Sequence, residues 1–449
     1  MFKCVIRYIS TTTIIHVESK PNESISSIVS KIPITVERIS PKSKPPIYQY
    51  KDGYQYVTPY KKLMYNNVSL KGIPQQLTVL QYLNKIFIGR NETFFKDQIL
   101  NNELWIYRPR KRFKKIEGKD FSKHQKIKGT TLLTTKIKTN DIIANFACIH
   151  ELKVPIFNLN DKENENLIFE DDNLLVINKP AGIPIHPSGM AYNYNSIEYM
   201  ITKNYLQTDK IWIIHRLDKD TAGVLILAKN SETCSKFNKI VENRNGLTKQ
   251  YLALVEGNFG DQIRIETNPI IEIDLSKPFN KGVGKEFNAK TVFKNVYYDS
   301  VSNTSLISCF LQNGRKHQIR QHLKNLGYPI INDPLYGKDK ILSMPIYSPP
   351  NREEFQRLRE LYENQLNERV DNWEMENVCT NCSHVTYNNQ LNVKDNYMRL
   401  FSFHYSYKDE HDGRNNWSFT APIPPWAKSI LPEGKADSLM KDHQVPIKE

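Results

Sequence analysis

Residues 211–230, IWIIHRLDKDTAGVLILAKN, contain two short apolar runs that flank a polar segment. The apolar runs are residues 211–214 and 224–228, and their length and β-branched content are typical of strands. The polar segment between them carries Arg216 and Asp218, so we predict a strand, a loop, and then a second strand or a helix start. Such a loop, held at the end of a buried element, is a common place for reactive groups. An isolated Arg-x-Asp would more often be two surface charges that neutralise each other.

Three other segments combine apolar strands with tight turns and basic residues. Residues 167–189, LIFEDDNLLVINKPAGIPIHPSG, predict two strands followed by a Lys-Pro-Ala-Gly turn. Residues 249–257, KQYLALVEG, alternate in the manner of a half-buried strand. Residues 306–337, LISCFLQNGRKHQIRQHLKNLGYPIINDPLYG, predict a strand, an Asn-Gly-Arg loop and a helix that Gly327 ends.

Together these segments resemble the RluA-type RNA pseudouridine synthases. Residues 215–223 are similar to the HRLDxxTSG motif of that family, with Ala222 where the family usually has Ser, and residues 249–257 match its KxYxAxVxG strand. Asn313 stands where the family normally has Thr. The resemblance implies an α+β pseudouridine synthase fold: a mixed, mainly antiparallel sheet with flanking helices and a central cleft, plus an N-terminal α/β extension.

The resemblance also implies the site residues. The catalytic residue of the family motif corresponds to Asp218, the ring against the target base to Tyr251, and the arginine that pairs with the aspartate to Arg320. The reaction needs a carboxylate that attacks the sugar C1′, assists its deprotonation or adds to the base, and the sequence leaves these three routes open. A paired guanidinium favours the ionised carboxylate. RNA contacts are expected from polar residues in and near the motifs, namely Arg216, His215, Lys249, Arg315, His317, Gln318 and Lys179.

The charge balance agrees with a nucleic-acid partner. The chain of 449 residues has 62 Lys and Arg against 48 Asp and Glu, a net charge of +14, and such a bias favours an anionic partner. We expect RNA, with tRNA ahead of rRNA, because residues 395–427 resemble the C-terminal strands of eukaryotic family members. No apolar stretch approaches the roughly 18 residues that span a bilayer. We therefore expect no membrane partner. We also expect a monomer, and no metal or organic cofactor, because the reaction is an isomerisation.

The length suggests two or three domains. We predict an N-terminal extension at 1–160, a catalytic domain at 161–430 with a helical insertion at about 345–375, and a disordered tail at 431–449. Within the extension, residues 139–155 resemble the end of an S4-like RNA-binding module. The basic, aromatic-rich segment 107–128 is predicted either to bind RNA or to be a solvated charged loop.

Two features near the chain ends stay open. The first 20 residues have no acidic residue before Glu18, which suits a mitochondrial presequence and a β-strand equally. We therefore expect a cytoplasmic location, a mitochondrial one or both, with the nucleus left open. Cys379 and Cys382 form one CxxC pair followed by His384. Zinc needs four ligands and no second Cys pair exists, so two unbound thiols are favoured.

Two other classes of protein fit less well. A glycosidase uses two opposed carboxylates and a metal nuclease uses clustered acidic ligands, whereas Asp218 has basic neighbours and only Asp220 nearby. An inactive RNA-binding protein of the same fold would be expected to have lost Asp218, Tyr251 or Arg320. All three are present. An RNA pseudouridine synthase is therefore the favoured function, with the inactive binding protein and an rRNA substrate as alternatives.

Overall fold

The computed structural model divides into two compact units, which are described separately. Unit 1 comprises Met1–Ile47, Val57–Glu151 and Leu366–Gln390, and unit 2 comprises Tyr48–Tyr56, Leu152–Gln365 and Leu391–Glu449. The described residues are 47–70, 76–86, 92–110, 121–161, 165–188, 192–273, 283–338, 397–409 and 416–446, without 123 and 244, plus strands at 3–7, 14–18, 37–38, 374–378 and 385–388 and helical residues at 352–353, 356–357 and 360.

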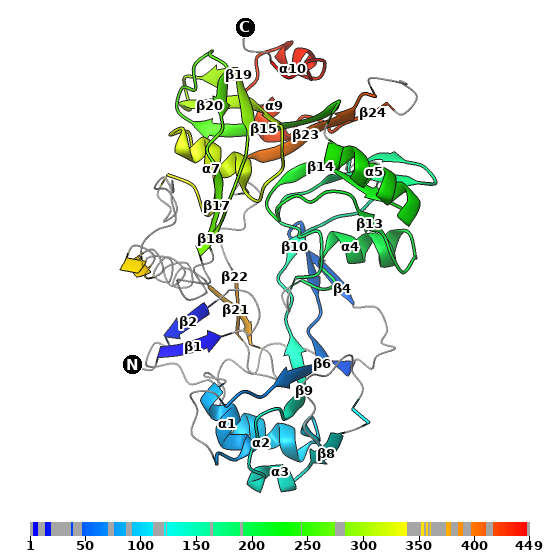
Figure 1. Cartoon of the computed structure of the whole chain (residues 1–449), viewed down its shortest axis with the longest axis vertical. Helices are drawn as coiled ribbons and strands as arrows, with labels where there is room; N and C mark the ends of the chain where they lie inside the picture. The colour runs from blue at the N-terminus through cyan, green and yellow to red at the C-terminus, as the bar shows by residue number, and fades with distance from the viewer. Residues whose placement is uncertain are drawn as a thin grey trace. The chain divides into compact units, whose positions relative to one another are not determined.

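Unit 2 is built on a ten-stranded sheet (Figure 1). In spatial order its strands are β11 (Leu167–Glu170), β12 (Leu174–Lys179), β14 (Ala222–Ala228), β23 (Leu400–Tyr407), β15 (Leu247–Glu256), β20 (Thr304–Leu311), β19 (Thr291–Asp299) and β16 (Arg264–Glu266), with β13 (Trp212–Ile213) beside β14 and β24 (Trp417–Thr420) beside β23. Only the β14–β23 pair is parallel among them. The predicted mixed, mainly antiparallel α+β fold is therefore confirmed.

Strand β14 shows why the sheet has this sequence pattern. Val224 and Ile226 belong to one hydrophobic cluster, and Leu225 and Leu227 belong to another. The strand is thus covered on both faces, which accounts for its continuous apolar run. The same is true of β15, where four consecutive residues from 252 to 255 are buried. The prediction that β15 is only half-buried was wrong, because two clusters enclose it.

Helices cover the two faces of this sheet. Helix α5 (Ser231–Asn243) packs on β13 and β14 and buries Phe237 in one cluster, while α4 (Ile197–Tyr199) and the following π-helix (Met200–Tyr205) contribute to the opposite one. Helix α7 (Gln318–Asn325) packs on β19 through a third cluster that contains Ile319 and Leu323. Unit 2 also contains a small sheet of β10 (Val154–Pro155), β5 (Tyr54–Val57) and β4 (Tyr48–Lys51), and a hairpin of β17 (Ile270–Ile273) and β18 (Val283–Phe287).

Residues 425–446 of the C-terminal segment pack on unit 2. Helices α9 (Pro425–Lys428) and α10 (Lys435–Leu439) follow β24, and Leu439 is 5% exposed within the main hydrophobic cluster. Asp442 pairs with Lys294 at 2.7 Å, and the His443 ring stacks on His404 at 3.7 Å. The prediction of a disordered tail at 431–449 was therefore wrong for residues 431–446. Although its sequence is mostly polar, Leu431 and Leu439 pack on the hydrophobic cluster and a few polar groups make specific contacts.

Unit 1 contains a five-stranded sheet with three helices. The strand order is β3 (Glu37–Arg38), β6 (Tyr60–Asn67), β9 (Ile142–Ile149), β7 (Leu104–Pro109) and β8 (His124–Lys128), and the helices are α1 (Val79–Ile86), α2 (Glu92–Leu100) and α3 (Thr131–Thr134). Two further pairs are β1 (Lys3–Arg7) with β2 (Ile14–Glu18), and β21 (Glu374–Val378) with β22 (Val385–Asn388). Residues 3–7 and 14–18 thus form strands, and the presequence stays a prediction.

The aromatic residues of the basic segment lie against one another. Tyr107 stacks on Phe121 at 4.1 Å, Phe121 stacks on Tyr65 at 5.0 Å, and Lys126 lies over Trp105 at 4.1 Å. Trp105 is buried, and Tyr65, Tyr107 and Phe121 are partly exposed. RNA binding by segment 107–128 stays a prediction, and Phe113 lies outside the described residues.

Several predictions fall on residues outside the described ranges. These are the CxxC pair with His384, and most of the helical insertion at about 345–375. Within the part of the chain that is described, no helix is long and apolar enough to cross a membrane.

Candidate active site

Asp218 lies in the loop between β13 and β14, as the strand-loop-strand pattern predicted. The backbone carbonyl of Asp218 accepts a hydrogen bond from the Thr221 N–H at 3.1 Å, so the loop closes in a tight turn. The Asp218 side chain is 24% exposed. It is therefore held by the scaffold while one side stays open to a ligand.

Gly223 fixes how closely this loop approaches the neighbouring strand. Its φ is +106°, and a Cβ there would lie 2.1 Å from the backbone oxygen of Ser402 on β23. Only glycine combines that φ with that contact. The β14–β23 pairing, with Gly223 opposite Ser402, depends on it.

Tyr251 reaches the same place from β15. Tyr251 pairs with Ser402 of β23, the same residue that pairs with Gly223. Strand β23 therefore lies between β14 and β15 and aligns both with the site. Burial raises the pKa of Tyr251 to about 12; a hydrogen bond from the Ser402 side chain opposes this shift, and the nearby Asp218 charge adds to it. The Tyr251 phenol is thus protonated at neutral pH.

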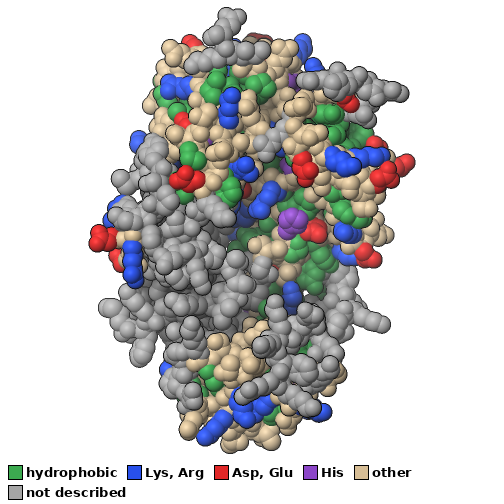
Figure 2. Space-filling model, in the orientation of Figure 1, with side chains coloured by type: hydrophobic (Ala, Val, Ile, Leu, Met, Phe, Trp, Pro, Cys, Tyr) green, Lys and Arg blue, Asp and Glu red, His purple; other side chains and the backbone are tan. Residues whose placement is uncertain are grey.

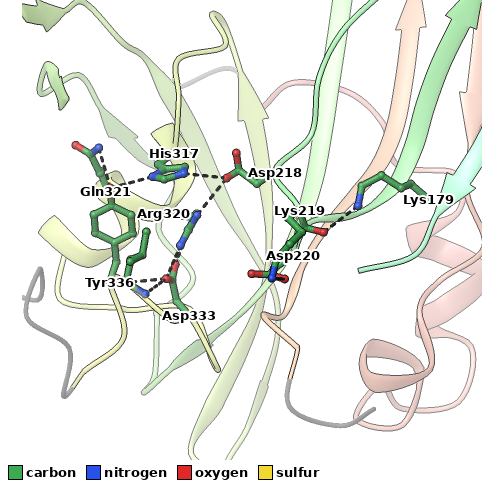
Figure 3. A network of polar contacts seen from close by, with 10 residues as sticks. Lys179, Asp218, Lys219, Asp220, His317, Arg320, Gln321, Asp333 and Tyr336 are labelled. Atoms are coloured by element: carbon green, nitrogen blue, oxygen red, sulfur yellow. Dashed lines mark hydrogen bonds and ion pairs between the residues drawn. The ribbon is translucent and has the colours of Figure 1, made fainter. Parts of the chain in front are cut away.

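Arg320 on α7 contacts two carboxylates at once (Figure 3). Its Nη1 donates to Asp218 Oδ2 at 3.2 Å, while its Nε and Nη2 donate to the two oxygens of Asp333, each at 2.7 Å. Burial opposes the charge on Arg320, but the hydrogen bonds and attraction to Asp333 raise its pKa above the ordinary value. The same contacts outweigh burial and hold the pKa of Asp333 below its usual range. The predicted pairing of Arg320 with Asp218 is confirmed as a contact.

His317 is the second residue, after Arg320, whose side chain lies next to the Asp218 carboxylate. Its Nε2 lies 3.6 Å from Asp218 Oδ2, and its Nδ1 lies 3.1 Å from the Tyr336 hydroxyl. Burial, assisted by the charge of Arg320, lowers the pKa of His317 to about 4, so the ring is neutral at neutral pH. His317 caps α7 with a φ of +57°, a left-handed conformation that is unusual outside glycine and often occurs at functional sites.

Comparison with known proteins identifies the family. Residues 173–325 match the RNA pseudouridylate synthase family. These residues of unit 2 belong to this family. It is 29% identical to "tRNA pseudouridine(31) synthase" of Saccharomyces cerevisiae over 335 residues, which cover 66% of this chain and 80% of that protein.

Two further relatives match shorter parts. The chain is 36% identical to "tRNA pseudouridine(32) synthase, mitochondrial" of Saccharomyces cerevisiae over 222 residues, covering 47% of this chain and 44% of that protein. It is 33% identical to "Ribosomal large subunit pseudouridine synthase C" of Buchnera aphidicola over 213 residues, covering 46% of this chain and 66% of that protein. The chain thus spans four fifths of the first relative and less than half of the second.

The structure places Lys179 away from any ligand of this synthase. Its side chain is fully buried, and its Nζ donates to the backbone carbonyls of Pro180, Ile183 and Lys219 at 2.8 to 3.0 Å. Burial lowers the pKa of Lys179 to about 7. The prediction that Lys179 contacts RNA was therefore wrong, because all three of its donors serve the turn beside Asp218.

His215 and Gln318 are also occupied by internal contacts. The Nε2 of His215 accepts the Ile226 N–H at 3.1 Å, and burial lowers the pKa of His215 to about 3. Gln318 is 2% exposed, with its amide donating to Lys290 O and Thr291 Oγ1. Gln318 was predicted to contact RNA, and that prediction was wrong, because its polar groups satisfy buried backbone and side-chain partners. The predicted RNA contact of His215 stays a prediction, since this residue is partly exposed.

Three predicted RNA-binding residues keep exposed surface. Arg216 is exposed, whereas Lys249 and Arg315 are partly buried. Lys249 Nζ lies 5.0 Å above the Tyr405 ring, and the Arg315 guanidinium lies 5.6 Å from the Phe287 ring. Figure 2 shows basic and histidine side chains on the part of unit 2 between α7 and α4.

Sequence reasoning missed Asp333, the residue in closest contact with Arg320. It is fully buried and lies in the sequence Asn332-Asp333-Pro334, the start of a tight turn. Asp before Pro is so common a turn signal that it gave no reason to expect a charge partner. An apolar context (Ile330 and Ile331 just before it) was the available hint that this carboxylate is buried.

Proposed function

We propose that this chain is an RNA pseudouridine synthase in which Asp218 carries the chemistry and tRNA is the substrate. One observation supports the assignment above the others. A partly exposed carboxylate is paired with a buried guanidinium at 3.2 Å and lies near a buried tyrosine from a neighbouring strand. A base turned out of its stack would meet all three groups.

The reaction balances without any other reactant. The bond between C1′ and N1 of a uridine breaks, the base turns, and C5 bonds to C1′. C5 then loses its proton and N1 gains one, so substrate and product have the same atoms. Asp218 would serve as the group that attacks C1′, assists its deprotonation or adds to the base.

Each neighbour of Asp218 has a distinct task in this scheme. Arg320 favours the ionised form of Asp218 through a charge-assisted hydrogen bond. Tyr251 offers its ring to the base. Because its pKa is raised to about 12 by burial, Tyr251 would have to give up its own proton before it could accept one from C5.

RNA binding would extend from this site over basic surface. Arg216, Lys249 and Arg315 would contact phosphates near the target base, and Lys126 and Lys128 of unit 1 would contact the RNA elsewhere. Both lysines are exposed. We expect the protein to act as a monomer.

The proposed substrate and location follow the names of the relatives reported above. Two relatives are named as tRNA pseudouridine synthases, and one of them is named as mitochondrial. We therefore propose tRNA in the mitochondrion, the cytoplasm or both. Ribosomal RNA is the second candidate, because a third relative is named as a ribosomal large subunit enzyme.

Transcriptome-wide pseudouridine mapping tests the proposal. Cells that lack this protein should lose pseudouridine at a small set of tRNA positions, and wild-type protein should restore them. Asp218→Ala protein, expressed at the same level, should restore none. If pseudouridine were lost only from rRNA, rRNA would be the substrate in place of tRNA. Restoration of pseudouridine by Asp218→Ala protein would contradict the role of Asp218.

A further inference from the structure

A short loop after α7 supplies the partners of both groups that contact Asp218. Asn332 has a φ of +61°, and Asp333 then begins a turn in which its Oδ1 accepts the Leu335 and Tyr336 N–H groups at 2.8 and 3.0 Å. The Gly337 N–H donates to the Asp333 carbonyl at 3.2 Å. The loop is therefore a rigid support for its two functional side chains, Asp333 and Tyr336.

Asp333 fixes the direction of the Arg320 guanidinium. Two parallel hydrogen bonds of 2.7 Å join them, and such a fork allows one orientation of the plane. In that orientation the remaining Nη1 points at Asp218 (Figure 3). The Tyr336 ring lies 5.1 Å below the guanidinium, so Arg320 is held from its edge and from its face.

Tyr336 fixes the tautomer of His317. The Gln321 amide donates to the Tyr336 oxygen at 3.3 Å, so the phenol hydrogen is free to be donated to His317 Nδ1, 3.1 Å away. An imidazole that accepts at Nδ1 and is neutral carries its proton on Nε2. That N–H lies 3.6 Å from Asp218 Oδ2.

We propose that Asp333 and Tyr336 are positioning residues that act through Arg320 and His317 to set the direction in which Asp218 presents its free oxygen. The proposal rests on the proposed function. Neither residue contacts the reacting atoms. Asp333 and Arg320 form one branch of contacts, and Tyr336 and His317 form a second branch. Both branches end on the same oxygen of Asp218, Oδ2. The other oxygen, Oδ1, is therefore left to face the substrate.

Asp333→Asn is the first test, because it keeps the shape and removes the charge. We expect kcat on tRNA to fall by about ten- to a hundredfold, the scale of a small misplacement of reacting groups, with KM and the Kd for tRNA unchanged. A residue that only stabilises the fold would lower Tm and the active fraction, with the kcat per active site retained. Unchanged kcat in folded Asp333→Asn protein would overturn the proposal.

A double-mutant cycle separates action through Arg320 from independent damage. In an Arg320→Lys background, which keeps the charge but loses the fork, Asp333→Asn should lower kcat by less than about twofold. Penalties that multiply in the double variant would overturn the proposal. Wild-type protein in the same assay reports on the proposed function, since a wild type that forms no pseudouridine fails for a different reason.

The matched control is Glu103→Gln in unit 1. The Glu103 side chain is 12% exposed, and both of its carboxylate oxygens accept hydrogen bonds from Lys61 Nζ, at 2.7 and 2.8 Å. Its loss should lower Tm and leave kcat as in wild type. A kcat loss equal to that of Asp333→Asn would show that the effect is general destabilisation, and would overturn the proposal.

Tyr336→Phe decides the matter if Asp333→Asn does not fold. It removes one hydroxyl and keeps the ring under Arg320. We expect kcat to fall severalfold at unchanged KM, and the effect to vanish in a His317→Asn background, in which asparagine tolerates the left-handed φ. Full kcat in Tyr336→Phe would contradict the second branch and, without a folded Asp333→Asn protein, the proposal as a whole.

Discussion

Arg320 pairs with two carboxylates, one of which is buried and the other partly exposed to solvent. Asp333 is fully buried and Asp218 is 24% exposed, so the guanidinium neutralises an interior charge and also reaches the surface of the site. Burying an ion is unfavourable unless its partner and hydrogen bonds are in place. The stability of this region and the geometry of Asp218 therefore depend on the same side chain.

Arg320→Met should separate these two effects. Removing the guanidinium leaves Asp333 as an uncompensated buried charge, which should cost about 3–5 kcal/mol in the free energy of unfolding. The double variant Arg320→Met/Asp333→Asn should recover much of that stability and none of the activity. Urea denaturation and tRNA assays on both variants measure this. A double variant no more stable than Arg320→Met would refute the account of the pair.

For single residues, the sequence predicted the central ion pair correctly but not which polar side chains are buried. The Asp218–Arg320 pair was predicted from motif resemblance and is present. Lys179 and Gln318 were predicted to meet RNA and instead satisfy interior carbonyl and hydroxyl groups. Their burial depends on strands and loops far apart in the chain, which local pattern does not encode.

The β14–β23 contact is the element on which the site depends most. Gly223→Ala would bring a methyl group to 2.1 Å from Ser402 O and would also strain a φ of +106°. Gly260, with a φ of +75° and open space around it, is the control for the φ penalty alone.

Gly260→Ala should cost about 1–2 kcal/mol, the usual penalty of a left-handed residue, and keep activity. Gly223→Ala should cost more and abolish activity, because the strand carrying Ser402 must move. Thermal denaturation and tRNA assays of the two proteins compare them. Equal stability and equal activity would contradict the importance given to this close approach.

The C-terminal segment is a second element whose contribution can be measured. Deleting residues 431–449 removes buried Leu439 and the stacked His443, so we expect a clear fall in Tm. Leu439→Ala alone should cost about 2–5 kcal/mol, as other buried leucines do. A truncated protein with the Tm of the full chain would instead support the disordered tail that the polar sequence suggested.

Buried histidines in unit 2 predict a direction of pH dependence. Burial lowers the pKa of His317 and of His404 to about 4, below the value of about 6.5 in an unfolded chain. Such groups contribute stability that is fully present above pH 6.5 and is lost as the pH falls toward 4. Urea denaturation between pH 7.5 and 4.5 should show this fall. Replacing His404 by Asn should make the slope shallower, and an unchanged slope would contradict the assignment.

For the molecule as a whole, net charge governs the encounter with RNA. With 62 basic and 48 acidic residues, affinity for tRNA should fall steeply with salt. Replacing Lys126 and Lys128 by Glu should raise KM for full-length tRNA and flatten the salt dependence, with kcat unchanged. Filter binding at several salt concentrations measures the salt dependence of the affinity, and turnover assays measure KM and kcat. An unchanged salt slope would place the RNA contact elsewhere.

The architecture of unit 2 was readable from sequence because central strands such as β12 and β14 are apolar on both faces and its turns carry diagnostic Gly and Pro. The N-terminal part was less readable, since strands β6 (YKKLMYNN) and β8 (HQKIK) of its sheet are rich in polar residues. Its strands are joined by contacts such as the ion pair of Arg108 with Asp141. The sequence around either residue does not predict this pair.

Tritium release from tRNA that carries [5-³H]uridine tests the central claim most directly, because the C5 hydrogen leaves only when C5 bonds to C1′. Wild-type protein should release one tritium per target uridine under single turnover. Asp218→Asn protein with native Tm and unchanged tRNA Kd should release it about a thousandfold more slowly or not at all. Release by Asp218→Asn at the wild-type rate would contradict the account.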